Sequence, residues 1–272
     1  MKHTSIFALT LLAALPALAQ NDLSWVSQRS GSDANNCLFT TPCQTFQGAY
    51  AKTASGGIIK AIDAGKYGVV SITQPITIDG NGVGASIDVI TASTAGVFVN
   101  TPGPVEIRNL GIHAAPGLFN SYGIESSNSN VIVDNVSITG GANWGVSVTG
   151  GTATINAVTV TNAGQGILIQ DATATITDSV TRYSSNVGIF VVGVSAVTQA
   201  LIERSRIISS TNVGLVSNNE GAAATTRISD CVITGNTTGV STFGGGQIIT
   251  FRNNTWAGNT TDGTTPFSIS QK

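Results

Sequence analysis

Residues 107–112 read Ile-Arg-Asn-Leu-Gly-Ile, and five further copies of this pattern follow along the chain. Successive copies start 26, 22, 21, 26 and 26 residues apart, and about a dozen residues after each comes Gly with an aliphatic neighbour. Repeats with a period of about 20 to 50 residues indicate one structural unit stacked on itself. The later copies begin at Val133, Ile155, Ile176, Ile202 and Ile228, and the paired residues are Gly123-Ile124, Gly145-Val146, Gly166-Ile167, Gly188-Ile189, Gly214-Leu215 and Gly239-Val240.

Each repeat has the periodicity of a β-strand. Apolar residues alternate, as in Val146 with Val148 and Ile167 with Ile169, and the repeats are rich in Val, Ile and Thr. Tetratricopeptide and ankyrin arrays need about 33 residues and two amphipathic helices per unit, which these repeats lack. Leucine-rich repeats need regularly spaced leucines, which are also missing. The pattern therefore predicts an all-β parallel coil, with successive turns about 4.8 Å apart.

The register of the copies predicts which residues face the interior. We expect the repeated glycines to stack at one corner and Asn109 and Asn135 to begin another, because both residue types tolerate left-handed backbone angles. A degenerate seventh copy is expected to begin at Phe251. One interior column is predicted to hold Ile107, Val133, Ile155, Ile176, Ile202, Ile228 and Phe251, and a second Leu110, Val136, Val158, Ser179, Ser205 and Cys231.

The segment before these copies carries a resemblance to a known superfamily. Residues 56–67 read Gly-Gly-Ile-Ile-Lys-Ala-Ile-Asp-Ala-Gly-Lys-Tyr, preceded by Trp25-Val26-Ser27 and Pro42-Cys43-Gln44-Thr45-Phe46. With the later repeats, these segments resemble the pectate-lyase-like right-handed β-helix superfamily, and more closely its bacterial secreted members of unassigned function. The resemblance implies that the coil is a right-handed parallel β-helix. The expected fold is thus a right-handed parallel β-helix of roughly eight to nine turns, with a short N-terminal capping helix. It is specific for architecture only.

The N-terminus has the pattern of an export signal. Lys2 and an apolar run from Ile6 to Leu15 precede Ala17-Leu18-Ala19. This run is too short to span a membrane, so we expect a Sec signal peptide and a periplasmic or extracellular protein. No later segment is predicted to cross a membrane as a helix. The expected organisation is a signal peptide at 1–19, an N-terminal region with a disulfide and capping helix at 20–55, and the β-helix at 56–272.

The three cysteines divide into a pair and a single residue. Cys37 and Cys43 flank a turn in the N-terminal region, and export favours a disulfide between them, with a metal pair as the alternative. Cys231 belongs to a predicted interior column, which favours an apolar filler over a nucleophile. Residues 45–54 place Phe46, Ala49, Tyr50 and Thr53 on one face of a helix that would cap the coil.

Charge argues against a nucleic-acid partner. Charged residues make up 10% of the chain and the formal net charge is −2, so no basic face is available to neutralise phosphates. No cofactor and no metal site are predicted.

No known catalytic constellation is recognisable. Paired Asp-Asp, Gly-His-Gly and Arg-x-Pro-x-x-Arg motifs are missing, so the catalytic residues are unknown and enzymatic activity stays open. Arg108 with Asp134, and Arg204 between Asp178 and Asp230, fit surface salt bridges better than a proton-transfer pair or calcium site, because the signs of charge alternate. His113 is expected to lie in the loop after the first copy, as a surface residue rather than a catalyst.

One outer face carries candidate ligand-binding residues. Tyr122 and Trp144 precede corner glycines on successive turns, and Glu125 follows the first of them. Aromatic rings pack on the C–H faces of sugars and polar groups bind hydroxyls, so Tyr122, Trp144 and Glu125 are predicted to contact a saccharide. Alternatively, inserted loops at residues 193–200 and 218–225 cover this face.

Three classes of function remain open. The first is an exported carbohydrate-binding or cell-surface structural protein whose partner is a polysaccharide or cell-surface glycan. The second is a polysaccharide lyase or hydrolase acting on an acidic or neutral glycan, which rests on analogy of fold. The third is an adhesin-type scaffold that contacts another protein.

Overall fold

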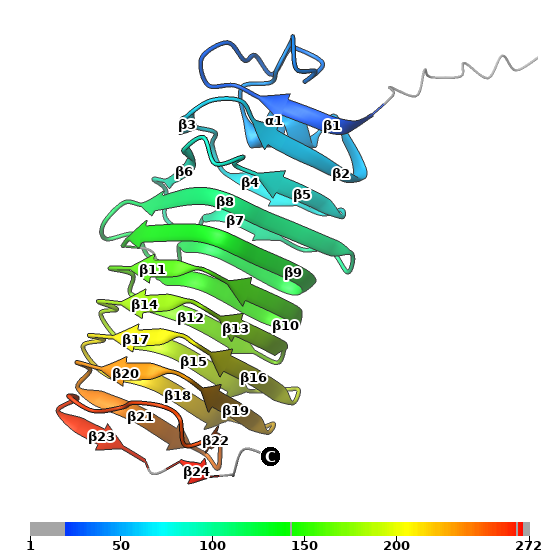
Figure 1. The fold of residues 1–272 in the computed structure, drawn as a ribbon. Coiled ribbons are helices and arrows are strands. Elements are labelled where there is room, and N and C mark those ends of the chain that lie inside the picture. Colours follow the sequence, from blue (N-terminus) through cyan, green and yellow to red (C-terminus); the bar gives the residue numbers. More distant parts are fainter. Residues whose placement is uncertain (1–19, 142, 265, 269–272) are drawn as a thin grey trace, which may run out of the picture.

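The computed structural model describes residues 20–141, 143–264 and 266–268. They form an elongated coil, with the N-terminal segment at one end and the last strands at the other (Figure 1). Each strand of the coil pairs in parallel with strands of the neighbouring turns, giving about eight turns. The predicted signal peptide lies outside the described residues.

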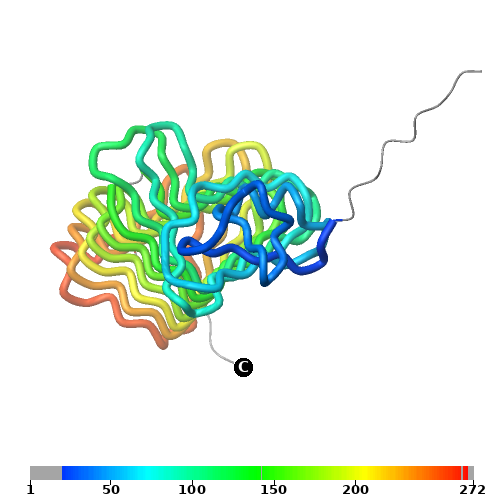
Figure 2. Tube along the Cα trace, turned by 90° about the horizontal axis from the view of Figure 1, so that it is seen from above, coloured from blue at the N-terminus to red at the C-terminus, as the bar shows by residue number. Residues whose placement is uncertain are grey.

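The strands form three stacks that make the sides of the coil, and the turns lie over one another with a gradual offset (Figure 2). Stack 1 contains β4 (Val70–Ile72), β7 (Ala95–Val99), the start of β9 (Tyr122–Gly140), the start of β10 (Trp144–Asn156), β12 (Gln165–Gln170), β15 (Val187–Gly193), β18 (Val213–Asn219), β21 (Thr238–Phe243) and β23 (Thr261–Gly263).

The other two stacks complete each turn, and the long strands β8, β9 and β10 bend from one stack to the next. Stack 2 contains β1 (Asn21–Val26), β2 (Thr53–Ala61), β5 (Ile76–Asp79), β8 (Pro104–Ala114), parts of β9 and β10, β13 (Thr173–Thr177), β16 (Thr198–Glu203), β19 (Ala224–Ser229), β22 (Gln247–Thr250) and β24 (Phe267–Ser268). Stack 3 contains β3 (Gly65–Lys66), β6 (Ala85–Val89), the ends of β8 and β9, β11 (Thr159–Thr161), β14 (Val180–Arg182), β17 (Arg206–Ile208) and β20 (Val232–Thr234).

The first interior column is confirmed through Ile228, and it extends backwards to Ile59 and Ile78 in earlier turns. The prediction for its last member was wrong. Thr250, not Phe251, pairs with Ile228 and is buried, whereas Phe251 is half-buried outside the strand. Thr250 Oγ1 accepts hydrogen bonds from Arg252 N and Asn254 Nδ2, which compensates this hydroxyl for its burial.

The second column is also buried, but hydroxyl groups replace its methyl groups toward the C-terminus. Ser179 Oγ accepts a hydrogen bond from Val158 N at 3.1 Å and donates to Thr177 O at 2.8 Å. Ser205 Oγ repeats this arrangement one turn later by accepting from Ser179 N at 3.2 Å. Cys231 is buried at the next position, where burial raises the pKa of its thiol, as expected for a filler residue.

The glycine corner forms as predicted, but for a different physical reason. None of the six corner glycines, Gly123 to Gly239, has a positive φ. A Cβ on Gly166 would lie 2.1 Å from the carbonyl oxygen of Gly188 in the next turn. The column therefore needs glycine because the backbones of successive turns approach too closely for a side chain.

The corner that begins at Asn109 does adopt left-handed angles. Asn109 has φ 58° and Asn135 φ 51°, and the same conformation continues in later turns at Ala157, Asp178, Arg204, Asp230 and Arg252. The amide side chains form a ladder, in which Asn135 Nδ2 donates to Asn109 Oδ1 at 2.8 Å and Asn109 Nδ2 donates to Asp79 Oδ1 at 2.9 Å.

A short helix and a disulfide close the N-terminal end. Helix α1 (Phe46–Tyr50) is shorter than predicted, because the chain re-enters strand β2 at Thr53, yet it buries Phe46 and Ala49 as expected. Thr45 caps it by accepting a hydrogen bond from Gly48 N at 2.9 Å. The predicted disulfide between Cys37 and Cys43 is confirmed.

Candidate functional site

The outer face of stack 1 holds all three predicted ligand-binding residues. Tyr122 pairs with Trp144 on the next turn, and Glu125 pairs with Ser147 on that turn and with Phe98 on the previous one. The alignment of repeats therefore placed these side chains on the correct face of the coil.

Trp144 is covered by its neighbours. Its side chain is 8% exposed and packs with Leu168 and Val192, and its ring stacks on Phe190 with centroids 6.3 Å apart and an interplanar angle of 10°. Tyr122, which is half-buried, packs against the edge of this cluster. Because so little of Trp144 is exposed, its ring offers little area to a ligand. Its role is to support the surface next to Tyr122 and Glu125.

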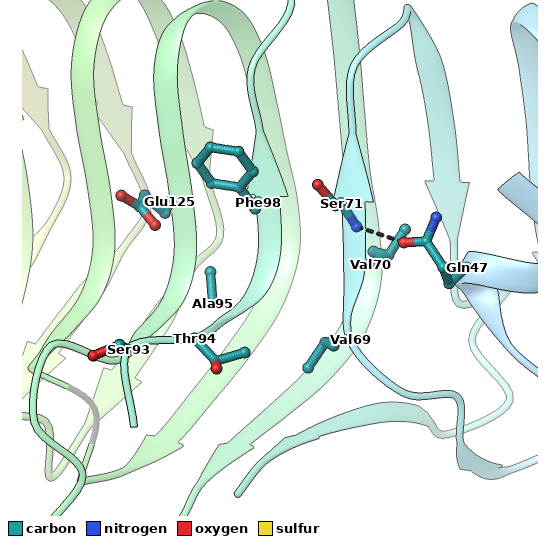
Figure 3. A pocket seen from close by; sticks show the side chains of 9 residues that line it. All are labelled: Gln47, Val69, Val70, Ser71, Ser93, Thr94, Ala95, Phe98 and Glu125. Atoms are coloured by element: carbon teal, nitrogen blue, oxygen red, sulfur yellow. Dashed lines mark hydrogen bonds between the residues drawn. The ribbon is translucent and has the colours of Figure 1, made fainter. Parts of the chain in front are cut away.

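A cavity of about 420 Å³ opens beside Glu125, at the N-terminal end of stack 1 (Figure 3). Its floor follows the strand register, since Ser71 in β4 pairs with Phe98 in β7 and Phe98 pairs with Glu125 in β9. Gln47 from α1 closes one end, where its Oε1 accepts a hydrogen bond from Ser71 N at 2.8 Å. The full lining comprises Gln47, Val69, Val70, Ser71, Ser93, Thr94, Ala95, Phe98 and Glu125.

A loop between β6 and β7 supplies one wall of this cavity. Ser93 and Thr94 line it, and Ser93 N donates a hydrogen bond to the carbonyl oxygen of Phe119 at 2.9 Å. The side chain of Phe119, in the neighbouring loop between β8 and β9, is 82% exposed. Two loops of successive turns are thus tied together next to the cavity.

Glu125 is the ionisable side chain of the cavity lining. It is half-buried, and this burial raises the pKa of its carboxyl above the ordinary value. Burial, with a smaller contribution from the charge of Glu125, also raises the pKa of the Tyr122 hydroxyl. A half-buried carboxylate of this kind can accept hydrogen bonds from a ligand or pair with a positively charged group on it.

Sequence reasoning missed Gln47, Ser71 and Phe98 as cavity residues. Ser71 and Phe98 belong to turns that precede the regular copies, and Gln47 belongs to the cap. The strand register contains a signal for two of them. The position equivalent to Glu125 is Phe98 on the previous turn and Ser71 on the turn before that.

The charged side chains elsewhere pair with one another, with Arg204 exposed and Asp79 buried. Arg108 contacts Asp79 at 3.1 Å and Glu106 at 2.9 Å, not Asp134 as predicted. Arg204 makes two hydrogen bonds to Asp178, at 2.9 and 2.8 Å, and it lies in an exposed corner. Both arrangements favour the salt-bridge interpretation.

His113 is exposed as predicted, but it lies in strand β8 and not in a loop. Within the described ranges, no group of three or more His, Cys, Asp or Glu side chains is placed to hold a metal ion. Nor does this part of the chain contain a helix long and apolar enough to cross a membrane.

Another cavity, of about 590 Å³, lies at the N-terminal cap and includes Asn35 and Lys52 in its lining. The ammonium group of Lys52 is already occupied there, because it donates hydrogen bonds to the carbonyl oxygens of Asp33 and Asn35. The cavity beside Glu125 is therefore the stronger candidate, since no residue in the described part of the chain pairs with its carboxyl group.

Comparisons with known proteins agree with this architecture. The crystal structure of pectate lyase Pel9A matches with a TM-score of 0.63 and 15% identity, over 94% of this chain and 80% of that one. An alginate lyase from Paenibacillus sp. str. FPU-7 matches with a TM-score of 0.47 and 13% identity, over 90% and 99%. At these identities the likeness is one of fold. No curated protein matches the chain.

The sequence model of a family described as "Right handed beta helix region" matches residues 95–256, which is more than half of the chain. This match agrees with the parallel coil, the glycine corner and the pectate-lyase-like architecture described above. The chain therefore belongs to the right-handed β-helix family.

Proposed function

We propose that this protein is an exported carbohydrate-binding protein and that it holds a saccharide in the cavity beside Glu125. The observation that carries the proposal is the row Ser71, Phe98 and Glu125, which crosses three successive turns on the floor of one open cavity. Successive turns of a β-helix lie about 4.8 Å apart, so a linear ligand would meet one of these side chains on each turn.

The chemistry of this row suits a sugar. The half-exposed ring of Phe98 offers an apolar surface for C–H groups, and the hydroxyls of Ser71 and Thr94 can donate or accept hydrogen bonds. The Glu125 carboxylate accepts hydrogen bonds from hydroxyl groups, and such charge-assisted bonds are stronger than neutral ones. Tyr122 adds an aromatic ring on the same strand as Glu125, where it pairs with Ala95 of the cavity lining.

Binding fits the cavity better than hydrolysis. Most glycoside hydrolases place two carboxyl groups about 5 to 9.5 Å apart across the scissile bond. The described lining of this cavity provides one carboxyl group, that of Glu125. The similarity to a structure named as a pectate lyase supports a carbohydrate ligand only by analogy of fold.

The proposed export rests on the predicted signal peptide and is supported by the disulfide between Cys37 and Cys43. Structural disulfides form and persist in oxidising compartments such as the periplasm and the extracellular space.

Binding to a panel of soluble oligosaccharides, measured by calorimetry, tests the proposal. We expect wild-type protein to bind at least one member, and Phe98→Ala to weaken that binding by about fivefold or more, since an aromatic contact contributes about 1 kcal/mol. Phe267→Ala is the matched control, because Phe267 is 64% exposed at the opposite end of the coil.

The control should bind as the wild type does. If the wild-type protein binds no oligosaccharide, or if Phe98→Ala and Phe267→Ala have equal affinity, the proposed role of this cavity is wrong.

A further inference from the structure

Stack 1 has a very uneven distribution of charge. From β4 to β21, its strand segments contain one acidic residue, Glu125, and no Lys or Arg. The loop and helix residues that complete the described cavity lining are Gln47, Val69, Ser93 and Thr94, which carry no charge. A ligand on this face would therefore meet a single negative charge and no fixed positive charge.

The carboxylate of Glu125 also lacks a partner within the part of the chain that the structure describes. Several acidic residues elsewhere have partners: Asp79 and Asp178 are paired with arginines, and Asp63 accepts hydrogen bonds from Ser27 Oγ at 2.6 Å and from Gln28 N at 2.8 Å. Glu125 is instead partly removed from water beside Phe98, in an open cavity (Figure 3). Burial of an unpaired charge is costly, so a ligand that supplies a partner is favoured.

Three kinds of sugar would interact with this carboxylate in different ways. A uronic acid would bring a second negative charge to a site without a cation, and like charges repel. A neutral sugar would donate hydroxyl hydrogen bonds. A protonated amino sugar would donate charge-assisted hydrogen bonds and also neutralise the charge, which makes it the best match.

We infer that the ligand class of this cavity is an amino-sugar glycan, with uncharged glycans bound less tightly and polyuronates excluded. This inference rests on the proposed carbohydrate-binding function and specifies its ligand. It also assigns a role to Glu125, as the residue that selects ligands by charge.

Three sets of oligosaccharides of equal length separate these cases, namely oligomers of glucosamine, of N-acetylglucosamine and of galacturonic acid. Calorimetry at about pH 6 and low salt keeps an ordinary amine protonated, and this pH lies well above the ordinary pKa of a glutamate carboxyl, which allows for the raised pKa of Glu125. We expect the glucosamine oligomer to bind about fivefold more tightly than its N-acetylated counterpart, which corresponds to the upper end of the range for an exposed ion pair. Added salt should reduce this difference.

Glu125→Gln keeps the size of the side chain and removes its charge. In this variant we expect the preference for the glucosamine oligomer to disappear and binding of the galacturonate oligomer to increase. Asp230→Asn is the matched control, because it removes an exposed carboxylate from a corner of the coil outside stack 1 and should leave the wild-type preference unchanged. Equal thermal melting of the two variants would show that both are folded.

The possible outcomes distinguish this inference from the proposed function. If wild-type protein binds the galacturonate oligomer as tightly as the glucosamine oligomer, or if the preference survives in Glu125→Gln, the inference is overturned and carbohydrate binding stands. If none of the three oligomers binds but another oligosaccharide of the panel does, only the inference is overturned. If no oligosaccharide of the panel binds, both are overturned.

Discussion

At the scale of single residues, the glycine corner is the feature with the least tolerance for change. A Cβ on Gly166 would lie 2.1 Å from Gly188 O, and backbone cannot move aside as a flexible side chain can. We therefore expect Gly166→Ala to lower the free energy of unfolding by about 1 to 3 kcal/mol, as for other overpacked sites. Urea unfolding followed by circular dichroism measures this change.

Gly111 provides the matched control for Gly166. Its nearest potential clash is with His113 Nε2 at 3.4 Å, and it has no positive φ. Gly111→Ala should change the free energy of unfolding by less than about 1 kcal/mol, or stabilise the protein slightly by restricting the unfolded chain. Equal losses in the two variants would contradict the explanation of this corner by close backbone approach.

Sequence patterns predicted the position of each ligand-binding candidate but not its exposure. Repeat alignment placed Tyr122, Trp144 and Glu125 on one outer face, because a two-residue period fixes which face a side chain takes. Exposure depends on the neighbours in adjacent turns, and for Trp144 these include Leu168 and Val192. The apolar character of those positions is visible in the sequence, but their packing on the tryptophan is not.

At the scale of strands and loops, the two ends of the coil were the least predictable. The seventh copy is shifted by one residue, so Thr250 fills the column that Phe251 was expected to occupy. The register of a regular copy can be read from its spacing to the copies before and after it. The last turn is followed by no further copy, so its register is not fixed in this way. In the first turns, Gly96-Val97 repeats the Gly-aliphatic pair and aligns Phe98 with Glu125, whereas no such pair lies in the same register before Ser71.

Asp171 holds the inserted loop between β15 and β16. Its Oδ1 accepts hydrogen bonds from Val194 N, Ser195 N and Ala196 N at 2.8, 3.0 and 3.0 Å, and its Oδ2 accepts from Ser195 Oγ at 2.8 Å. Although burial acts in the opposite direction, these bonds lower the pKa of Asp171 to about 2 from an ordinary value of 3.8. The loop is therefore tied to the previous turn by a charged carboxylate.

The lowered pKa fixes the direction of the pH dependence. Because the pKa of Asp171 is lower in the folded state, its ionised carboxylate stabilises the loop. This stabilisation is complete above the unfolded-state pKa of 3.8 and is lost as the pH falls through about 2. We expect the amide resonances of Ser195 and Ala196 to titrate with a midpoint near 2. Asp171→Asn should abolish this titration, whereas a midpoint near 3.8 in the wild-type protein would contradict these contacts.

At the scale of the whole molecule, the coil arranges one side chain per turn along its axis. Each turn contacts mainly its neighbours, so a ligand that follows the axis meets residues from segments about 25 residues apart in sequence. Ser71, Phe98 and Glu125 come together in this way, on β4, β7 and β9. The proposed ligand site is thus a product of stacking, and a single segment of the sequence does not contain it.

The proposed function requires that a saccharide occupy the cavity beside Glu125. Hydrogen exchange followed by mass spectrometry tests this claim directly, with the protein saturated by whichever oligosaccharide of the panel binds most tightly. We predict slower exchange on binding in residues 69–73, 93–98 and 122–127, and unchanged exchange in the strands of stacks 2 and 3. Slower exchange only in stacks 2 and 3, with no change in the three segments of stack 1, would contradict binding in this cavity.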